Sequence, residues 1–351
     1  MGAGLGGMLL PGGAGAGTNG SLGKIAAKAG VIFGASAGDE IFQNPAYGDL
    51  YAAEARIITT DVALKFDWVQ PSRGKWDFAR AERLLRFAGE HAMAMRGHTL
   101  IWNENAPGWL KAAPARQRQR IMDEHIEKVA SRFAGRLHSW DVVNEPFWPG
   151  HGKAGGYRDG PWLDAMGPGY IKRAFIRTAK ADPKARLILN EAHCERGDDV
   201  GKSIRAAMLR LVDELQHAGA PLHGIGLQGH LQPQKPYDDN EFVDFLWQLN
   251  ERKLDIYITE FDVNDEAYAS NIARRDQQVA RRCHDFLQAV LKVPAVKMLI
   301  SWQLSDRYSW YKDIAAKSWP LARPAPRPLP FDAALRKKPA WSAMAAALEG
   351  R

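Results

Sequence analysis

Two glutamates in this 351-residue chain each follow a short apolar segment, where a carboxylate could take part in chemistry. Glu145 lies in Trp140–Pro146 (WDVVNEP), and Glu260 lies in Ile258–Val263 (ITEFDV). A carboxylate at the end of a buried strand is costly to keep unless it is paired or used. Two such groups facing one cleft can cleave a glycosidic bond, one as general acid and one as nucleophile, when their carboxyl groups are roughly 5–5.5 Å apart. The alternative for each glutamate is an ion pair with Arg or Lys at the edge of the fold.

Two more segments end in side chains that can bind a polar ligand or hold a proton. Gly224–His230 (GIGLQGH) ends in a histidine, and Arg96–Trp102 (RGHTLIW) contains a histidine and ends in a tryptophan. The flat face of tryptophan can support the C–H face of a pyranose ring. The four segments form one site only if the fold brings their ends together.

Eight short, nearly continuous apolar runs indicate the elements that would do so. They are Val31–Ser36, Arg56–Thr59, Ala94–Thr99, Leu137–Val143, Arg186–Asn190, Gly224–Gly229, Asp255–Thr259 and Val296–Trp302. Such runs are typical of parallel strands buried on both faces. Amphipathic helical patterns lie between them, including Met122, Ile126, Val129 and Phe133; Phe242, Phe245, Leu246 and Leu249; and Val279, Cys283, Phe286, Leu287 and Val290.

This alternation predicts an α/β fold, a single closed (β/α)8 TIM barrel, in preference to an open doubly wound sheet. Pro183 and Pro294 follow helical patterns and should stop those helices. In a barrel, the long connections Phe147–Pro168 and Ser305–Pro330 would lie at the carboxyl ends of the strands, where binding sites are built.

The barrel is expected to cover residues 24–351, because residues 1–23 are almost entirely Gly, Ala, Leu, Pro and small polar residues. We interpret residues 1–23 as a disordered leader or the remnant of an export signal, although no basic segment precedes the apolar part. An export signal would make the protein secreted or periplasmic.

Composition excludes several classes of protein. The chain carries 47 Lys and Arg against 40 Asp and Glu, a net charge of +7, but the basic residues are dispersed, so nucleic-acid binding is not expected. No apolar stretch approaches the length of a transmembrane helix. Cys194 and Cys283 cannot form a disulfide framework and are either two buried side chains or one bridge. We expect a monomer.

The segments WDVVNEP, ITEFDV, RGHTLIW and GIGLQGH resemble the best-marked blocks of glycoside hydrolase family 10, the β-1,4-xylanase family. Val31–Ala37 (VIFGASA), Leu329–Asp332 and Lys338–Trp341 (KPAW) extend the resemblance over roughly Lys24 to the C-terminus. It implies a secreted, retaining endo-β-1,4-glycanase that hydrolyses xylan-type polysaccharide by double displacement, with no cofactor and no metal.

The resemblance also implies roles for individual residues. Glu145 corresponds to the acid/base, whose pKa should be raised, and Glu260 to the nucleophile, which should stay ionised. His230 would hydrogen-bond Glu260, with Asp262 fixing the imidazole. Asn144 should reach the sugar 2-hydroxyl. Positions lining the subsites on the non-reducing side are matched by Lys65, His98, Trp102, Gln228, Trp302 and Trp310.

Some of these assignments have structural alternatives. Trp302 and Trp310 could belong to the core, and His98 could be a hydrogen-bonded structural histidine. Asn190, at the end of the fifth predicted strand, receives no role. His193 is expected at the surface rather than in the site.

The chain departs from the family in the distal glycone subsite. Where the family has Glu-Asn-x-Met-Lys, this chain has Asp61–Lys65 (DVALK). Asp61 is still expected to bind substrate, whereas Val62 lacks the amide of the family's asparagine. Asn103–Asn105 (NEN) replaces a typical His-x-Gln, and Gln303 replaces a more usual glycine after the tryptophan. Another β-linked chain, such as a bacterial exopolysaccharide or a uronate-bearing xylan, is therefore the alternative substrate.

Three other classes of protein remain as competing hypotheses. The first is a metal-dependent barrel hydrolase that uses His98 and His230, although a His-x-His pair on the first strand is absent. The second is a Schiff-base lyase or aldolase that uses Lys65. The third is a non-catalytic polysaccharide-binding barrel.

Overall fold

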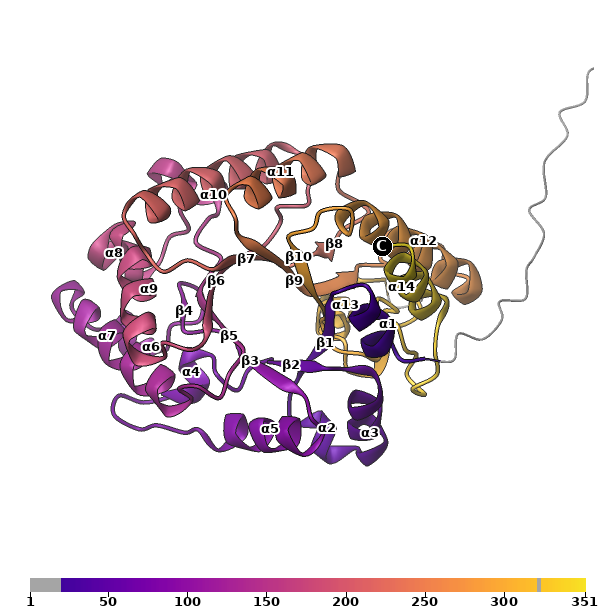
Figure 1. Cartoon of the computed structure of the whole chain (residues 1–351), viewed down its shortest axis with the longest axis horizontal. Coiled ribbons are helices and arrows are strands. Elements are labelled where there is room, and N and C mark those ends of the chain that lie inside the picture. The colour runs from indigo at the N-terminus through magenta and orange to yellow at the C-terminus, as the bar shows by residue number, and fades with distance from the viewer. Residues whose placement is uncertain (1–19, 321–322) are drawn as a thin grey trace, which may run out of the picture.

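Eight parallel strands close into a ring at the centre of the computed structural model, which describes residues 20–320 and 323–351 (Figure 1). The strands are β1 (Ile32–Ala37), β2 (Ile57–Thr60), β3 (Ala94–Gly97), β5 (Ser139–Asn144), β6 (Arg186–Glu191), β7 (Gly224–Leu227), β9 (Asp255–Val263) and β10 (Val296–Ser301). Each is parallel to its neighbours, and pairing of β10 with both β1 and β9 closes the ring. Two short strands, β4 (Ile101–Trp102) and β8 (His230–Leu231), extend the pairing beside β5 and β9. The predicted TIM barrel is confirmed.

Helices surround the ring (Figure 1). They are α1 (Leu22–Lys28), α2 (Glu40–Gln43), α3 (Pro45–Glu54), α4 (Phe66–Val69), α5 (Ala79–Glu90), α6 (Gly108–Lys111), α7 (Ala115–Arg132), α8 (Pro161–Met166), α9 (Gly169–Ala181), α10 (Asp199–His217), α11 (Asp239–Glu251), α12 (Ile272–Val290), α13 (Tyr311–Ser318) and α14 (Pro339–Glu349). The described residues also contain three 3-10 helices, η1 (Pro149–His151), η2 (Ala154–Gly156) and η3 (Asp306–Tyr308).

The helix boundaries follow from the local sequence. The side chains of Asp198, Asp238 and Asn271 accept hydrogen bonds from backbone N–H groups in the first turns of α10, α11 and α12. Helices α9 and α12 end before Pro183 and Pro294, as predicted. The apolar faces predicted on α7, α11 and α12 are all buried. In the described part of the chain, no helix combines the length and the apolar character that a membrane span requires.

The ring is filled rather than open. Ile57, Ile188, Tyr257, Met298 and Ile300 form one apolar cluster, whereas their sequence neighbours pack in the larger cluster that also contains the helices. Side chains alternate between the two faces of a strand, so the smaller cluster lies inside the barrel. A filled interior leaves the strand ends as the place for a site.

The two ends of the described chain meet at one buried carboxylate. Glu54 accepts hydrogen bonds from the Leu22 backbone N–H (2.7 Å) and from Nε1 of Trp341 on α14 (3.2 Å). A Cβ on Gly23 would lie 2.6 Å from the Glu54 carbonyl oxygen, so only glycine fits there. Residues 20–23, predicted to belong to the leader, are described by the structure, and Leu22 and Gly23 pack against the barrel; residues 1–19 of the predicted leader lie outside the described residues.

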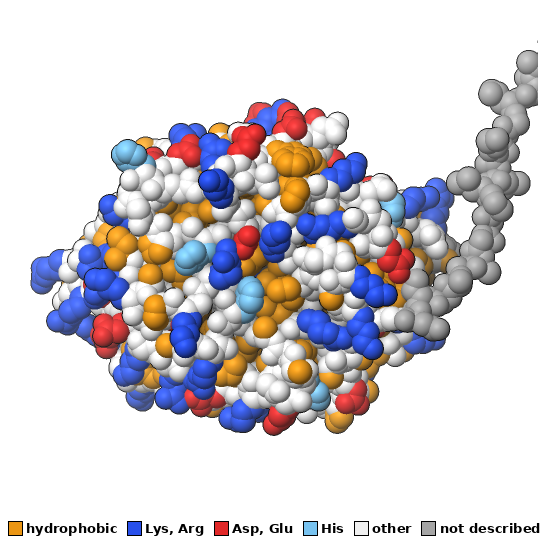
Figure 2. All heavy atoms as spheres, in the orientation of Figure 1, with side chains coloured by type: hydrophobic (Ala, Val, Ile, Leu, Met, Phe, Trp, Pro, Cys, Tyr) orange, Lys and Arg blue, Asp and Glu red, His pale blue; other side chains and the backbone are white. Residues whose placement is uncertain are grey.

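The structure resolves two further questions raised by the composition. Cys194 and Cys283 are both buried and unpaired, so the bridge is excluded. Figure 2 shows Lys and Arg side chains scattered over the face in view, with Asp and Glu between them.

The long connections after β5 and β10 contain secondary structure. The first contains η1, η2 and α8, and the second contains η3 and α13.

Candidate active site

A cavity of about 290 Å³ lies where the predicted site segments end. Ten of the twelve predicted site residues line it: Lys65, His98, Trp102, Asn144, Glu145, Gln228, His230, Glu260, Trp302 and Trp310. It is also lined by Glu104, Ala192, His193 and Gln232, which we did not predict. Asp262 does not line the cavity but contacts His230, which does. The barrel therefore brings the four segments together, as their residue types suggested.

Glu260 is held by hydrogen bonds from both sides. Its Oε2 lies 3.2 Å from Nε2 of His230, and its Oε1 accepts from Nδ2 of Asn190 at 2.8 Å. Nδ1 of His230 lies 2.9 Å from Asp262 Oδ1. Because both ring nitrogens face carboxylate oxygens, both must carry a proton to donate. Burial would lower the pKa of His230, but the two carboxylates raise that pKa well above its usual value.

The surroundings of Glu260 keep it ionised. Burial alone would raise the pKa of its carboxyl group, but the His230 hydrogen bond and nearby positive charges, including Lys65, lower that pKa to about 2. Asp262, which orients His230, also accepts from Nε1 of Trp310 (2.8 Å) and from the Tyr311 hydroxyl (3.2 Å). A desolvated, ionised and tightly oriented carboxylate is suited to nucleophilic attack.

Glu145 has the opposite electrostatic setting. Burial raises the pKa of its carboxyl group, the Arg158 guanidinium and the Gln228 hydrogen bond oppose that rise, and Glu260 adds to it. Gln228 Nε2 donates to Glu145 Oε1 at 2.8 Å, and Arg158 Nη2 lies 3.0 Å from Oε2. The backbone of Glu145 is left-handed, with φ of 50°. Such strain in a non-glycine residue is typical of functional positions, and a carboxyl group with a raised pKa is suited to donating a proton.

An amide pair connects the two carboxyl groups. Asn144 Nδ2 lies 3.3 Å from Glu145 Oε1, and Asn144 Oδ1 accepts from Asn190 Nδ2 at 2.8 Å. Asn190 in turn donates to Glu260 and accepts from the Thr259 hydroxyl at 2.7 Å. A Cβ at Gly226 would lie 2.2 Å from Asn190 Oδ1, so glycine is required beside this amide. Asn190, which received no role from the sequence, is thus a central part of the site.

We predict that Asn190→Ala lowers kcat by roughly 5- to 150-fold, because the loss of a buried hydrogen-bonding partner costs about 1–3 kcal/mol. The change would leave Glu260 with one fewer donor and Asn144 without its orienting partner. Steady-state kinetics and a thermal melt would separate loss of activity from loss of fold. Thr259→Val is the matched control, since it removes only the outer hydrogen bond and should cost less; an equal effect of the two variants would contradict the assignment.

The residues expected on the glycone side form an aromatic wall beside one lysine. Nζ of Lys65 lies 5.3 Å from the centre of the Trp102 ring. The rings of His98 and Trp302 are 5.5 Å apart in an edge-to-face contact, and the Trp310 ring lies 5.1 Å from that of His230. Trp302 is 6% exposed and Trp310 is 39% exposed, so Trp302 is mainly a wall and Trp310 is an open surface.

His98 is also a hydrogen-bonded structural histidine, which was the alternative interpretation of this residue. Its Nδ1 lies 2.9 Å from Oδ2 of Asp141, which pairs with the fully buried Arg96 inside the barrel. The side chain is therefore fixed from below while it lines the cavity above. The predicted and alternative interpretations of His98 are thus compatible.

Asp61 stands beside the cavity rather than in its lining. Its Oδ2 accepts from Gln303 Nε2 at 3.1 Å, and Gln303 Oε1 accepts from the hydroxyls of Tyr47 and Tyr51, each at 3.1 Å. Gln303 has φ of 74°, a conformation that favours glycine, the residue expected there from the family resemblance. Two buried hydrogen bonds and one partly buried hydrogen bond therefore hold a strained glutamine, and with it one oxygen of Asp61.

The expectation for His193 was wrong. It lines the cavity, its φ is 62°, and burial lowers the pKa of its imidazole to about 4. It lies two residues after Glu191, the last residue of β6. The signal available from the sequence was its position three residues after Asn190.

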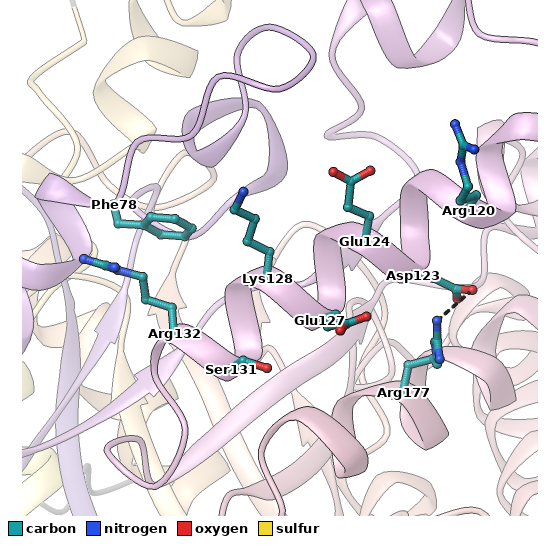
Figure 3. Close-up of a pocket in the computed structure, with 9 residues that line it drawn as sticks. All are labelled: Phe78, Arg120, Asp123, Glu124, Glu127, Lys128, Ser131, Arg132 and Arg177. Carbon is teal, nitrogen blue, oxygen red and sulfur yellow. Dashed lines mark ion pairs between the residues drawn. The ribbon is translucent and has the colours of Figure 1, made fainter.

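A larger groove lies elsewhere, over α7 (Figure 3). Its volume is about 790 Å³, and its walls are charged side chains of α7 with Phe78 and Arg177. Asp123 pairs with Arg177 at 3.2 Å, and Arg132 pairs with Glu82. These groups neutralise one another on the helix layer, so the groove lacks the converging, perturbed carboxyl groups of the smaller cavity. Within the described residues, no group of three or more His, Cys, Asp or Glu side chains is arranged to hold a metal ion.

Comparisons with known proteins agree with this site. Residues 21–347 match glycosyl hydrolase family 10. The chain is 31% identical to endo-1,4-beta-xylanase B of Thermotoga neapolitana, over 82% of this chain and 81% of that protein. It is also 31% identical to endo-1,4-beta-xylanase 2 of Claviceps purpurea, over 90% and 87%. The solved structure of xylanase 10B from Thermotoga petrophila RKU-1 in complex with xylobiose superposes with a TM-score of 0.84 at 30% identity, covering 96% of this chain and 99% of that one.

Proposed function

Because the chain belongs to glycosyl hydrolase family 10, we propose that it is a retaining endo-β-1,4-glycanase that hydrolyses xylan-type polysaccharide. The observation that carries the proposal is one cavity with two glutamates of opposite character. The pKa of Glu145 is raised by burial, and that of Glu260 is lowered by His230 and neighbouring positive charges. Two carboxyl groups whose pKa values differ in this direction can divide the acid and nucleophile roles between them.

The reaction follows in two displacements. Glu260 attacks the anomeric carbon, the glycosidic C–O bond breaks, and Glu145 gives its proton to the departing oxygen. The product is a glycosyl ester on Glu260 and an ionised Glu145. Glu145 then takes a proton from water as that water attacks the anomeric carbon, which releases the sugar with its original β configuration. Asn144 supports the 2-hydroxyl in both transition states, and Trp302 and Trp310 hold the sugar rings.

Product analysis tests the substrate and the stereochemistry together. Xylan, glucuronoxylan, mixed-linkage glucan and xylo-oligosaccharides would be incubated with the enzyme, and the products followed by chromatography, mass spectrometry and ¹H NMR. We expect xylo-oligosaccharides from xylan, with the β-anomer formed first. The α-anomer as first product would overturn the retaining mechanism. Release from another β-linked polymer alone, for example a bacterial exopolysaccharide, would retain the mechanism and replace the substrate.

The pH dependence of kcat/KM should reflect the two carboxyl groups. Glu145 must be protonated, so the rate falls as the pH rises through its pKa, which burial places above the ordinary carboxyl range. Glu260 must be ionised, so the rate falls only as the pH drops toward about 2. We expect a broad profile whose alkaline limb disappears in Glu145→Ala. An alkaline limb that survives in that variant would assign it to another group.

The competing classes make different predictions for the same protein. A metal-dependent hydrolase would lose activity with a chelator, and a Schiff-base enzyme acting through Lys65 would be trapped by borohydride in the presence of substrate. A non-catalytic binding barrel would retain polysaccharide without turning it over. We expect chelator-insensitive turnover and no trapped adduct.

We further propose that the protein acts as a secreted or periplasmic monomer. A polysaccharide is too large to cross a membrane unaided, which supports a site of action outside the cytoplasm. Cell fractionation with antibody detection would test the location, and light scattering after gel filtration would test the monomer.

A further inference from the structure

Arg158, in the connection after β5, lies between two carboxyl groups. Its Nη2 is 3.0 Å from Oε2 of Glu145, and its Nη1 forms an ion pair with Oε1 of Glu104. The Arg158 side chain is only 6% exposed, whereas Glu104 is 50% exposed. One buried guanidinium is thus shared between the predicted acid/base and a carboxylate at the solvent edge of the same cavity.

The backbone fixes Arg158 in this position. Nε of Arg158 donates to the Glu145 carbonyl oxygen at 2.8 Å, and Nη2 donates to the Phe147 carbonyl oxygen at 3.4 Å. The guanidinium also lies 5.6 Å from the centre of the Trp148 ring. These contacts hold the cation in place. Its effect on the pKa of Glu145 therefore depends on the charge of its other partner, Glu104.

Other charged groups face this pair from neighbouring elements. Glu191, at the end of β6, is fully buried and accepts from the backbone N–H groups of Phe147 (3.0 Å) and Ala192 (2.8 Å). Glu260 on β9 adds negative charge, and the protonated His230 adds positive charge. Glu104 differs from these groups because it is exposed and can be changed without opening the core.

We propose that Glu104 is a positioning residue that shares the Arg158 guanidinium with Glu145 and so keeps the acid/base protonated at higher pH. The inference rests on the proposed function, in which Glu145 donates the proton.

The sign follows from simple electrostatics. A guanidinium beside a carboxyl group favours the ionised form and lowers the carboxyl pKa, whereas a nearby carboxylate favours the protonated form and raises it. Glu104 does both things that favour protonation, since it competes for Arg158 and adds its own negative charge. Glu104→Gln removes both effects, so Glu145 should lose its proton at lower pH.

The test compares the pH dependence of kcat/KM for two substrates. A xylo-oligosaccharide needs its leaving oxygen protonated, whereas a 2,4-dinitrophenyl glycoside does not. In Glu104→Gln, we expect the alkaline limb for the oligosaccharide to move down by about half to one pH unit, the range for a partly screened charge interaction. The pH profile for the dinitrophenyl substrate should be the same in the variant and the wild type, because its kcat/KM does not depend on the protonation of Glu145. In Glu104→Asp, which keeps the carboxylate, the alkaline limb should lie close to its wild-type position.

Asp159→Asn is the matched control. Asp159 lies in the same connection, is 47% exposed and pairs with Lys153 at 3.0 Å, so the variant changes the net charge equally without removing a partner of Arg158. Its alkaline limb should stay in place. An unmoved limb in Glu104→Gln, or an equal shift in Asp159→Asn, would overturn the inference. Failure of the proposed function looks different. In that case the wild-type enzyme would hydrolyse neither substrate, or the Glu145→Ala variant would keep the alkaline limb.

Discussion

Glu260→Ala should lower kcat/KM for xylan by at least about 10⁴-fold, because the variant cannot form the glycosyl ester. In the native site, Glu260 accepts hydrogen bonds from His230 and Asn190 and carries a pKa lowered to about 2. Nothing else in the cavity lining offers an ionised oxygen held in this way. The loss should affect activated and natural substrates alike, since both require the nucleophile.

Azide rescue tests the role rather than the loss. The space left by the Glu260 carboxyl group can admit azide, which would attack an activated glycoside directly and give an α-glycosyl azide. NMR of that product identifies the face of attack. Glu251→Ala, an exposed change at the end of α11, is the control and should be fully active. A β-glycosyl azide from Glu260→Ala would show that another group is the nucleophile.

The fold could be predicted because burial on both faces leaves a clear pattern in the sequence. Every strand of the ring begins or ends within a few residues of a predicted apolar run, and the longest, β9, is buried in all but its first residue. The proposed catalytic pair was indicated by the sequence because Glu260 directly follows such a run and Glu145 lies two residues after another. These features depend on local sequence, which is available without the structure.

Residues positioned by distant contacts could not be predicted in the same way. Arg158 lies 13 residues after Glu145, in a Gly-rich connection whose path is set by η1, η2 and their left-handed glycines. Asp61 and Gln303 are 242 residues apart, and only closure of the barrel brings β2 and β10 to either side of β1. Asn190 did carry a signal, because it is a polar residue at a strand end, as Glu145 and Gln228 are.

The departures in the glycone subsite now have a physical basis. The shorter Asp61 reaches Gln303 instead of extending into the cavity, and Gln303 in turn takes up the hydroxyls of Tyr47 and Tyr51. The hydrogen-bonding capacity that the family directs toward a sugar is thus partly used within the protein. This arrangement supports the expectation that the chemistry of the site follows the family more closely than its substrate preference does.

Glu145→Ala should separate substrates by their leaving groups. We expect kcat/KM for xylan to fall by about 10²–10⁴-fold, the usual contribution of general acid catalysis. For a 2,4-dinitrophenyl glycoside the first step should change little, because that leaving group departs without a proton. The second step still needs Glu145 as base, so the glycosyl ester on Glu260 should accumulate. A burst of dinitrophenol in stopped-flow measurements, followed by slow turnover, is the expected signature.

Azide distinguishes this variant from Glu260→Ala by stereochemistry. In Glu145→Ala, azide needs no base and would attack the accumulated ester, which restores turnover and gives a β-glycosyl azide. The two alanine variants should therefore yield azides of opposite configuration from one substrate. That outcome requires Glu145 and Glu260 to act on opposite sides of the same bond, which a pair of structural ion pairs cannot imitate. Equal losses on both substrates, without a burst, would instead mean that Glu145 maintains the site through Arg158 and Gln228 and donates no proton.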